Sequence, residues 1–263
     1  MTTEQPSKAL LDFRNVAVMR GDKIALDGVT LRIQAGEHVA ILGPNGCGKS
    51  TLIKTITREC YPLARPDSAL RILGRESWNV FQLRTLLGIV SNDLMSASTR
   101  EITGLETVLS GFFSSIGLQP YHHVTEEMLK KSRAVLELLE VPHLVSREMT
   151  AMSSGEARRI LIGRALVHDP MSLLLDEPSN SLDPRAAFEL RAILRKLAQS
   201  GTGILLVTHQ LADIIPEIDR VILLRGGRIF ADGNKEDLLT SARLAELFGL
   251  GVTLARRDGY YHL

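Results

Sequence analysis

Hydrophobic and polar residues alternate over much of the first ninety positions. Short alternating or wholly apolar runs, bounded by turn residues such as Gly21 and Gly36, are typical of β-strands. The runs that fit this pattern span residues 11–19, 29–34, 38–42, 71–74 and 86–90. We therefore expect an N-terminal portion rich in antiparallel β-structure.

The pattern becomes helical from about residue 100 to residue 165. Thr125 and two following acids can open a helix whose apolar positions recur on one side, and Pro142 marks its end. Short apolar strands and helices then alternate again: strands at 172–176 and 203–209, helices at 184–200 and 211–218, and a hairpin at 221–233. Apolar strands separated by helices predict a parallel sheet buried on both faces.

The expected fold is an α/β core with a phosphate-binding loop, an antiparallel β portion and an inserted helical subdomain at about 93–165. We expect one domain over residues 11–249, a flexible N-terminus at 1–10 and a C-terminal tail at 250–263. With 31 basic and 30 acidic side chains, the net charge is 31 − 30 = +1. This balance gives no electrostatic reason to expect direct binding of nucleic acid.

Two cysteines, Cys47 and Cys60, suggest neither a metal site nor a disulfide framework, and favour a cytoplasmic location. The first residues lack the apolar region of a signal peptide. No apolar run approaches the roughly 20 residues that span a membrane. Work at a membrane would therefore require a separate chain that crosses it.

Residues 43–50, GPNGCGKS, fit the pattern G-x-x-x-x-G-K-[ST] between a predicted strand and a predicted helix. Glycines let the backbone wrap around phosphates, Lys49 supplies a positive charge, and the Ser50 hydroxyl can ligate Mg²⁺. The alternative is a glycine-rich turn that ends in Lys-Ser by chance. The flanking elements favour a nucleoside triphosphate site made by Gly43, Pro44, Asn45, Gly46, Cys47, Gly48, Lys49, Ser50 and Thr51.

Acidic residues follow the predicted strand at 172–176. Asp176 ends this strand, where it can hold Mg²⁺, and Glu177 can polarise an attacking water. The alternative is an ordinary acidic turn after a strand. His209 ends the next predicted strand, and a lone histidine there is more often structural than catalytic.

Four segments in order, GPNGCGKSTL, MSSGEARR, SLLLDEPSNSLD and VTH, resemble the nucleotide-binding domain of the ATP-binding cassette (ABC) family. The similarity runs from about residue 11 to about residue 249. Kinases and GTPases share the first motif only. The resemblance implies an ATPase in which two subunits pair head to tail around ATP and Mg²⁺.

The resemblance also implies individual roles. Glu177 matches the catalytic carboxylate and His209 the histidine that senses the γ-phosphate. Residues 153–156 match the signature that contacts ATP held by the partner subunit, and Asp183 matches an aspartate that contacts that subunit. The signature residues are Ser153, Ser154, Gly155 and Glu156.

The signature departs from the family's usual Ser-Gly-Gly-Gln. Ser154 replaces a glycine, and it would be strained if this position required a positive φ. Glu156 replaces a glutamine and adds a negative charge near phosphate, which Arg158 or Arg159 could compensate. Residues 152–159 could also simply cap a helix.

Two further positions differ from the family. Arg20 stands where an aromatic residue normally stacks on adenine; a guanidinium can also stack, but a solvated arginine in a turn is an equal alternative. Asn92 stands where a glutamine normally joins Mg²⁺ to the helical subdomain, and its shorter amide could act through water. An Asn-Asp turn after a strand is the alternative.

The resulting hypothesis is an ATP-hydrolysing subunit that energises transport through a separate integral membrane permease, and the resemblance implies that it pairs as a homodimer. It would lie on the cytoplasmic face of the membrane when bound to that permease. The alternative is a stand-alone ABC-family ATPase that acts on a protein or nucleic-acid complex. Such proteins commonly carry two cassettes or a long coiled-coil insertion, neither of which occurs in this sequence.

Overall fold

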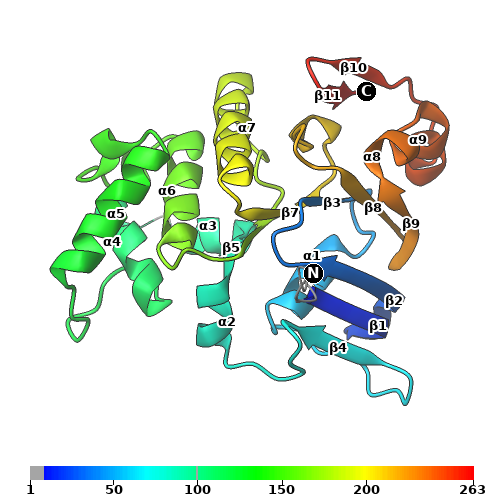
Figure 1. Cartoon of the computed structure of the whole chain (residues 1–263), viewed down its shortest axis with the longest axis horizontal. Coiled ribbons are helices and arrows are strands. Elements are labelled where there is room, and N and C mark those ends of the chain that lie inside the picture. The colour runs from blue at the N-terminus through cyan, green and yellow to red at the C-terminus, as the bar shows by residue number, and fades with distance from the viewer. Residues whose placement is uncertain (1–8, 99) are drawn as a thin grey trace, which may run out of the picture. The chain divides into compact units, whose positions relative to one another are not determined.

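The computed structural model describes residues 9–98 and 100–263, so residues 1–8 of the expected flexible N-terminus lie outside the described part. The chain forms two compact units (Figure 1). Unit 1 combines the described part of Met1–Val80 with Gly203–Leu263, and unit 2 is Phe81–Thr202.

Unit 1 contains an antiparallel sheet in the order β2-β1-β4. Its strands are β1 (Ala9–Arg20), β2 (Lys23–Gln34) and β4 (Ala69–Ile72). Gly21, with φ 58°, lies in the tight turn from β1 to β2, where a side chain would be unfavourable. The predicted antiparallel β portion is therefore confirmed.

A second set of strands in unit 1 has the order β7-β3-β8-β9. These strands are β3 (Val39–Leu42), β7 (Gly203–Thr208), β8 (Arg220–Arg225) and β9 (Arg228–Asn234). β3 pairs in parallel with both β7 and β8, and every residue of β3 and β7 is buried. Burial on both faces explains why these strands are continuous apolar runs.

The remaining elements of unit 1 are short. They are α1 (Lys49–Ile56), η4 (Leu211–Asp213), α8 (Lys235–Leu238), α9 (Ser241–Phe248), β10 (Ala255–Arg257) and β11 (Tyr260–His262). The helix predicted at 211–218 is wrong, because only one 3₁₀ turn forms there. Pro216 has no N–H to donate and disfavours helical geometry at the residue before it.

Unit 2 is mostly helical. Its elements are α2 (Val80–Leu86), β5 (Leu87–Val90), α3 (Asn92–Ser98), α4 (Gly104–Leu109), η1 (Ser110–Phe113), α5 (Glu126–Leu138), η2 (Pro142–Leu144), η3 (Met149–Ala151), α6 (Ser154–Leu166), β6 (Ser172–Asp176) and α7 (Pro184–Gln199). β5 and β6 pair in parallel. Thr125 caps α5, as the sequence predicted.

Helix α6 is the centre of unit 2. A Cβ on Gly163 would lie only 3.1 Å from Leu139 and 3.2 Å from Val108, so α6 packs closely against its neighbours. Leu136, Ile160, Leu161 and Ile162 are fully buried in this core. The tight packing fixes the position of the residues at the N-terminus of α6.

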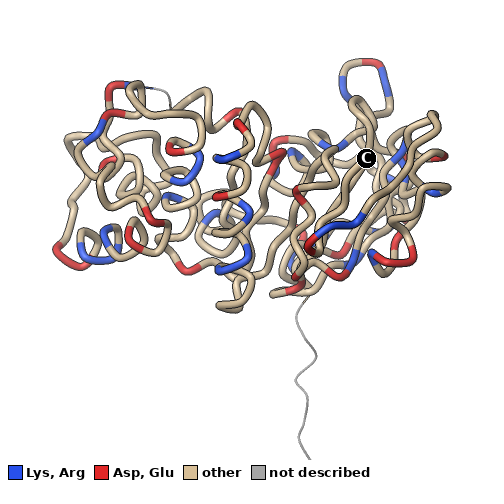
Figure 2. Tube along the Cα trace, turned by 90° about the horizontal axis from the view of Figure 1, so that it is seen from above, with Lys and Arg blue, Asp and Glu red and all other residues tan. Residues whose placement is uncertain are grey.

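Figure 2 shows basic and acidic residues interspersed along the trace of each unit, in keeping with the balanced charge. Among the described residues, no helix combines the length and the hydrophobicity needed to cross a membrane.

Candidate functional site

The glycine-rich loop lies in unit 1 between β3 and α1. The ammonium group of Lys49 donates to the carbonyl oxygens of Gly43 (2.8 Å) and Pro44 (3.1 Å). Lys49 is only 5% exposed. Its charge is thus held inside the curve of the loop, where a phosphate chain would lie.

Two glycines let this loop lie against neighbouring backbone. Gly48 has φ 110°, and a Cβ there would lie 2.7 Å from the carbonyl oxygen of Ala25. A Cβ on Gly43 would collide with the carbonyl oxygen of Leu224 and with the sulfur of Cys47. Cys47 itself is buried and its carbonyl accepts from Gly227, so it fills space in the loop.

Helix α1 begins without a side-chain cap. Gly48 is its N-cap residue and offers no side-chain acceptor, and the first turn contains no acid. A helix that begins in this way keeps its positive N-terminal potential for an external anion. The loop and the helix together are suited to bind phosphate.

His209 belongs to the same unit as the loop. Leu42 and Thr208 are register partners in the parallel pair of β3 and β7, so Gly43 and His209 each follow directly after a paired residue. The Thr208 hydroxyl donates to Asp213 at 2.9 Å and accepts from the Gln210 N–H at 3.0 Å, which shapes the turn containing His209. The structure thus places His209 at the carboxyl end of β7, beside the carboxyl end of β3, where the glycine-rich loop begins.

Arg20 lies at the end of β1, also in unit 1. Its guanidinium donates to the sulfur of Cys60 at 3.4 Å, and the residue is exposed.

Asp176 and Glu177 lie in unit 2, where β6 ends. Glu177 has φ 46°, which is uncommon for a residue with a side chain. Its carbonyl accepts from the N–H of Asn180 at 3.0 Å in a tight turn. Backbone strain of this kind, roughly 1–3 kcal/mol, is often found where a side chain must point in one functional direction.

Arg158 of α6 connects Asn92 with the region of Asp176. Its two terminal nitrogens donate to the Asn92 side-chain oxygen at 3.3 and 3.2 Å. Burial lowers the pKa of Arg158, and the nearby Asp176 carboxylate partly opposes this shift. The amide oxygen that we expected to reach Mg²⁺ is thus held by Arg158.

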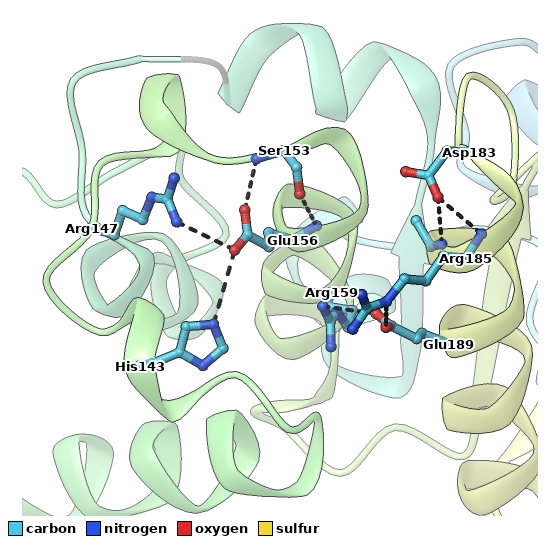
Figure 3. Close-up of polar contacts among 9 residues, drawn as sticks. His143, Arg147, Ser153, Glu156, Arg159, Asp183, Arg185 and Glu189 are labelled. Carbon is cyan, nitrogen blue, oxygen red and sulfur yellow. Dashed lines mark hydrogen bonds and ion pairs between the residues drawn. The ribbon is translucent and has the colours of Figure 1, made fainter.

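Residues 152–159 form the start of α6 (Figure 3). Ser153 is the N-cap and Glu156 the third helical residue, and they form a capping box. The Glu156 N–H donates to the Ser153 hydroxyl at 3.3 Å, and the Ser153 N–H donates to the Glu156 carboxylate at 2.8 Å. The interpretation of this stretch as a helix cap is therefore confirmed.

The charge of Glu156 is balanced by residues that the sequence did not indicate. Its carboxylate pairs with Arg147 at 3.3 Å and lies 3.9 Å from His143 (Figure 3). The expectation that Arg158 or Arg159 compensates Glu156 is wrong, because Arg158 binds Asn92 and Arg159 pairs with Glu189 at 3.4 Å. Desolvation raises the Glu156 pKa, but the bonds from Ser153, with Arg147 and His143, outweigh it and leave the pKa lowered.

Ser154 joins the signature to the loop that carries Asp183. Its hydroxyl donates to the Ser181 carbonyl at 3.3 Å, and it is absent from the residues with positive φ, so serine is not strained there. A Cβ on Gly155 would lie 2.7 Å from the Cβ of Ala186, which brings the starts of α6 and α7 together. The signature and the Asp183 loop are therefore neighbours within unit 2.

Asp183 caps α7. Its carboxylate accepts from the N–H groups of Arg185 and Ala186, both at 2.9 Å (Figure 3). Glu189, one turn after Arg185, pairs with Arg185 at 2.9 Å and with Arg159 of α6. These contacts hold the two helix starts side by side.

The predicted residues are thus divided between the units. Unit 1 brings the start of the glycine-rich loop and His209 to the neighbouring carboxyl ends of β3 and β7, and places Arg20 at the end of β1. Unit 2 brings residues 153–156 beside Asp183, and Asn92 beside Arg158. The sequence analysis missed Arg147 and His143. The available signal was a basic residue, Arg147, six positions before Ser153, close enough along the chain to pair with Glu156.

Comparison with known proteins identifies relatives over nearly the whole chain. The family model described as "ABC transporter" matches residues 26–180. A putative ABC transporter ATP-binding protein of Streptococcus mutans is 30% identical, with 95% of this chain and 96% of that protein covered. The hemin import ATP-binding protein HmuV of Hahella chejuensis is 32% identical, with 89% and 90% covered. A cobalt import ATP-binding protein of Syntrophus aciditrophicus is 29% identical, with 89% and 81% covered.

Solved structures are similar as well. The ADP conformation of an ATP-binding cassette of an ABC transporter aligns with TM-score 0.76 at 26% identity, covering 91% of this chain and 98% of that one. The dimeric structure of a bacterial ABC transporter cassette aligns with TM-score 0.68, also at 26% identity, covering 85% and 98%.

Proposed function

The chain belongs to the ABC transporter family, and from this premise we propose how its residues divide the work of an ATPase subunit. ATP binds in the loop at residues 43–51, a second subunit closes on it, and hydrolysis energises transport through a separate permease. The observation that carries the proposal is the start of α1, which has buried Lys49 but no side-chain cap. Helices α5, α6 and α7 are all capped by their own side chains.

Hydrolysis is assigned to Glu177, with His209 as the contact to the γ-phosphate. A carboxylate can accept a proton from the attacking water, and the positive φ of Glu177 supports a fixed direction for its side chain. Asp176 ends the buried strand β6, which gives it a rigid support.

The partner subunit is contacted through the start of α6. The Ser153 hydroxyl accepts from Glu156, so its proton can be donated to an anion. Among the described residues, nothing accepts from the N–H groups of Ser154 and Gly155, which lie in the first turn, where an intrahelical partner is lacking. These three donors form the γ-phosphate contact, and Asp183 contacts the partner beside it.

Mg²⁺ fits the donors of this chain. A hydroxyl and a carboxylate are hard oxygen ligands of the kind that Mg²⁺ prefers, so Ser50 and Asp176 would hold the ion. Asn92 would first have to exchange its bond with Arg158. The bound ion would neutralise phosphate charge during hydrolysis.

Import through a membrane permease is the proposed use of the ATP. Relatives of nearly equal identity are named for hemin import and for cobalt import. Because ATPase subunits with similar sequences serve such different substrates, we assign the choice of substrate to the permease. The subunit works on the cytoplasmic face of the membrane, where ATP is present.

Complementation between two inactive variants tests the shared site. Lys49→Ala removes the phosphate-binding charge, and Ser153→Arg blocks the start of α6. In a mixed dimer, one site combines an intact Lys49 with an intact Ser153. A mixture of the two variants should therefore recover up to about a quarter of wild-type turnover, since half of the dimers are mixed and each has one good site. No recovery, with mixed dimers shown by mass spectrometry, would contradict the proposal.

A further inference from the structure

The start of α6 contains a negative charge close to the place where a phosphate is proposed to bind. Glu156 is the third helical residue, and its carboxylate lies beside the Ser153 N–H. A carboxylate in this position stabilises the helix but repels an approaching anion. The phosphate contact therefore requires that this charge be balanced and kept away from the anion.

Both oxygens of the Glu156 carboxylate are engaged on the side of the preceding loop. Oε2 accepts from the Ser153 N–H at 2.8 Å, and Oε1 pairs with Arg147 at 3.3 Å. Figure 3 shows the carboxylate between Ser153 on one side and Arg147 and His143 on the other. The partners of the carboxylate are thus the Ser153 N–H, Arg147 and His143, and neither oxygen accepts from the N–H of Ser154 or Gly155.

Arg147 is held in place by a second bond. Its Nη2 donates to the carbonyl oxygen of Ala151 at 2.6 Å, while Nη1 contacts Glu156. The Arg147 backbone carbonyl also accepts from the Gly104 N–H at 2.9 Å, which ties this loop to α4. Both terminal nitrogens of the guanidinium are therefore hydrogen-bonded, which fixes the position of its charge.

We propose that Arg147 is a positioning residue for the partner's phosphate: it neutralises Glu156 and holds its carboxylate in the capping box, so that the Ser153 hydroxyl and two N–H groups face the anion. This inference rests on the proposed function. His143, at 3.9 Å, adds a weaker contact to the same carboxylate oxygen.

A double-mutant cycle tests the proposal. Arg147→Gln is made alone and together with Glu156→Gln, in a Glu177→Gln background that preserves bound ATP. ATP-driven dimerisation is measured by analytical ultracentrifugation. Two unit charges about 4 Å apart near water interact by roughly 1 kcal/mol, so Arg147→Gln should weaken dimerisation about fivefold when Glu156 is present. When residue 156 is glutamine, the same change should have less than about a twofold effect, because no charge remains to be balanced.

Two further variants make the cycle specific. Arg147→Lys retains the charge and should recover most of the loss. Arg133→Gln removes one positive charge from an exposed position of α5, whereas the described partners of Glu156 are Arg147 and His143. It should change dimerisation by less than about twofold, because exposed charges are screened by salt. Thermal unfolding of each variant shows whether the fold is intact.

The outcomes separate this inference from the proposed function. An equal loss from Arg147→Gln in both backgrounds, or no loss with Glu156 present, would overturn the role of Arg147 while ATP still drives dimerisation of the parent protein. Failure of the proposed function would appear earlier, as a parent protein that does not dimerise with ATP at all. Loss confined to the Glu156 background, with recovery by lysine, supports the inference.

Discussion

Helix α1 begins at Lys49 after a glycine N-cap, without any side-chain cap, whereas α6 begins at Ser154 with a complete capping box. Both starts are proposed to bind phosphate of the same ATP molecule, one in each subunit. At α1 the chain supplies a buried cation and no acid in the first turn. At α6 the chain supplies an acid, and an arginine that balances it.

If both starts bind phosphate as proposed, this contrast separates the primary binding of ATP from the contact with a partner subunit. In the proposed function, the uncapped start with its buried lysine attracts ATP to the single subunit. A capped start with balanced charge should attract free phosphate only weakly. The Ser153 N–H already donates to the Glu156 carboxylate, and the Glu156 N–H already donates to the Ser153 hydroxyl. We therefore expect it to contribute only when a second subunit presents ATP to it.

The largest expected effect comes from Glu177→Gln. Loss of the general base should lower ATP turnover by about 10²–10⁴ while ATP binding is retained. The measurement is phosphate release together with ATP titration. Turnover at the wild-type level would show that Glu177 is not the general base of this reaction.

Replacement of the cation at α1 tests the comparison directly. Lys49→Ala should weaken ATP binding to the single subunit by about 10- to 150-fold, since a charged hydrogen bond contributes about 1.5–3 kcal/mol. Ser153→Ala should leave that affinity within about twofold, because its hydroxyl is proposed to contact the partner's ATP. Titration with a fluorescent ATP analogue at concentrations below dimerisation measures both. Equal losses would show that the two starts do not differ as proposed.

The cap at α6 also contributes to stability. Ser153→Ala should lower the free energy of unfolding by about 1 kcal/mol, as for other N-cap serines. Thr125→Ala is the matched control, because Thr125 caps α5 by the same type of bond to the N–H of Met128. Both changes should lower stability in urea unfolding, but only Ser153→Ala should impair ATP-driven dimerisation. Impairment by Thr125→Ala would mean that loss of stability alone explains the effect.

The smallest expected effect is on the pH dependence of stability. The Glu156 pKa is lowered in the folded chain, so its ionised form stabilises the fold above the ordinary pKa of 4.5. This contribution should disappear as the pH falls through the lowered folded pKa. The wild type should therefore lose slightly more stability than Glu156→Gln between neutral and acidic pH, by less than about 1 kcal/mol because the ion pair is near the surface. Unfolding in urea at several pH values measures the difference, and identical curves would contradict the assigned pKa shift.

Much of the fold follows from local pattern. The strands at 11–19 and 38–42 and the helix opened by Thr125 needed only alternation, apolar runs and a capping residue. The helix predicted at 211–218 does not form despite its apolar spacing, because Pro216 lacks an N–H and disfavours helical geometry at the residue before it. The hairpin of β10 and β11 gave no clear signal, since it depends on burial of Tyr261, which is 4% exposed, in the folded chain.

The candidate site divides in the same way. Motifs with fixed spacing, such as residues 43–50, could be found in the sequence because they lie in one short continuous segment of the chain. The partner of Glu156 could not be found, because Arg147 is nine residues away and reaches it only through the loop before α6. Arg158 and Arg159 are closer in sequence, but they point to Asn92 and Glu189.

The amino-acid sequence was enough to identify the family, the glycine-rich loop and the capped start of α6. These features depend on contacts within a few residues, whose geometry the backbone dictates. Long-range packing in the folded chain selects which cation balances Glu156 and which donor holds Asn92, and it brings Ser154 to the Asp183 loop. Such contacts depend on how separate segments pack, and side-chain direction on a helix, rather than distance along the chain, selects the partner.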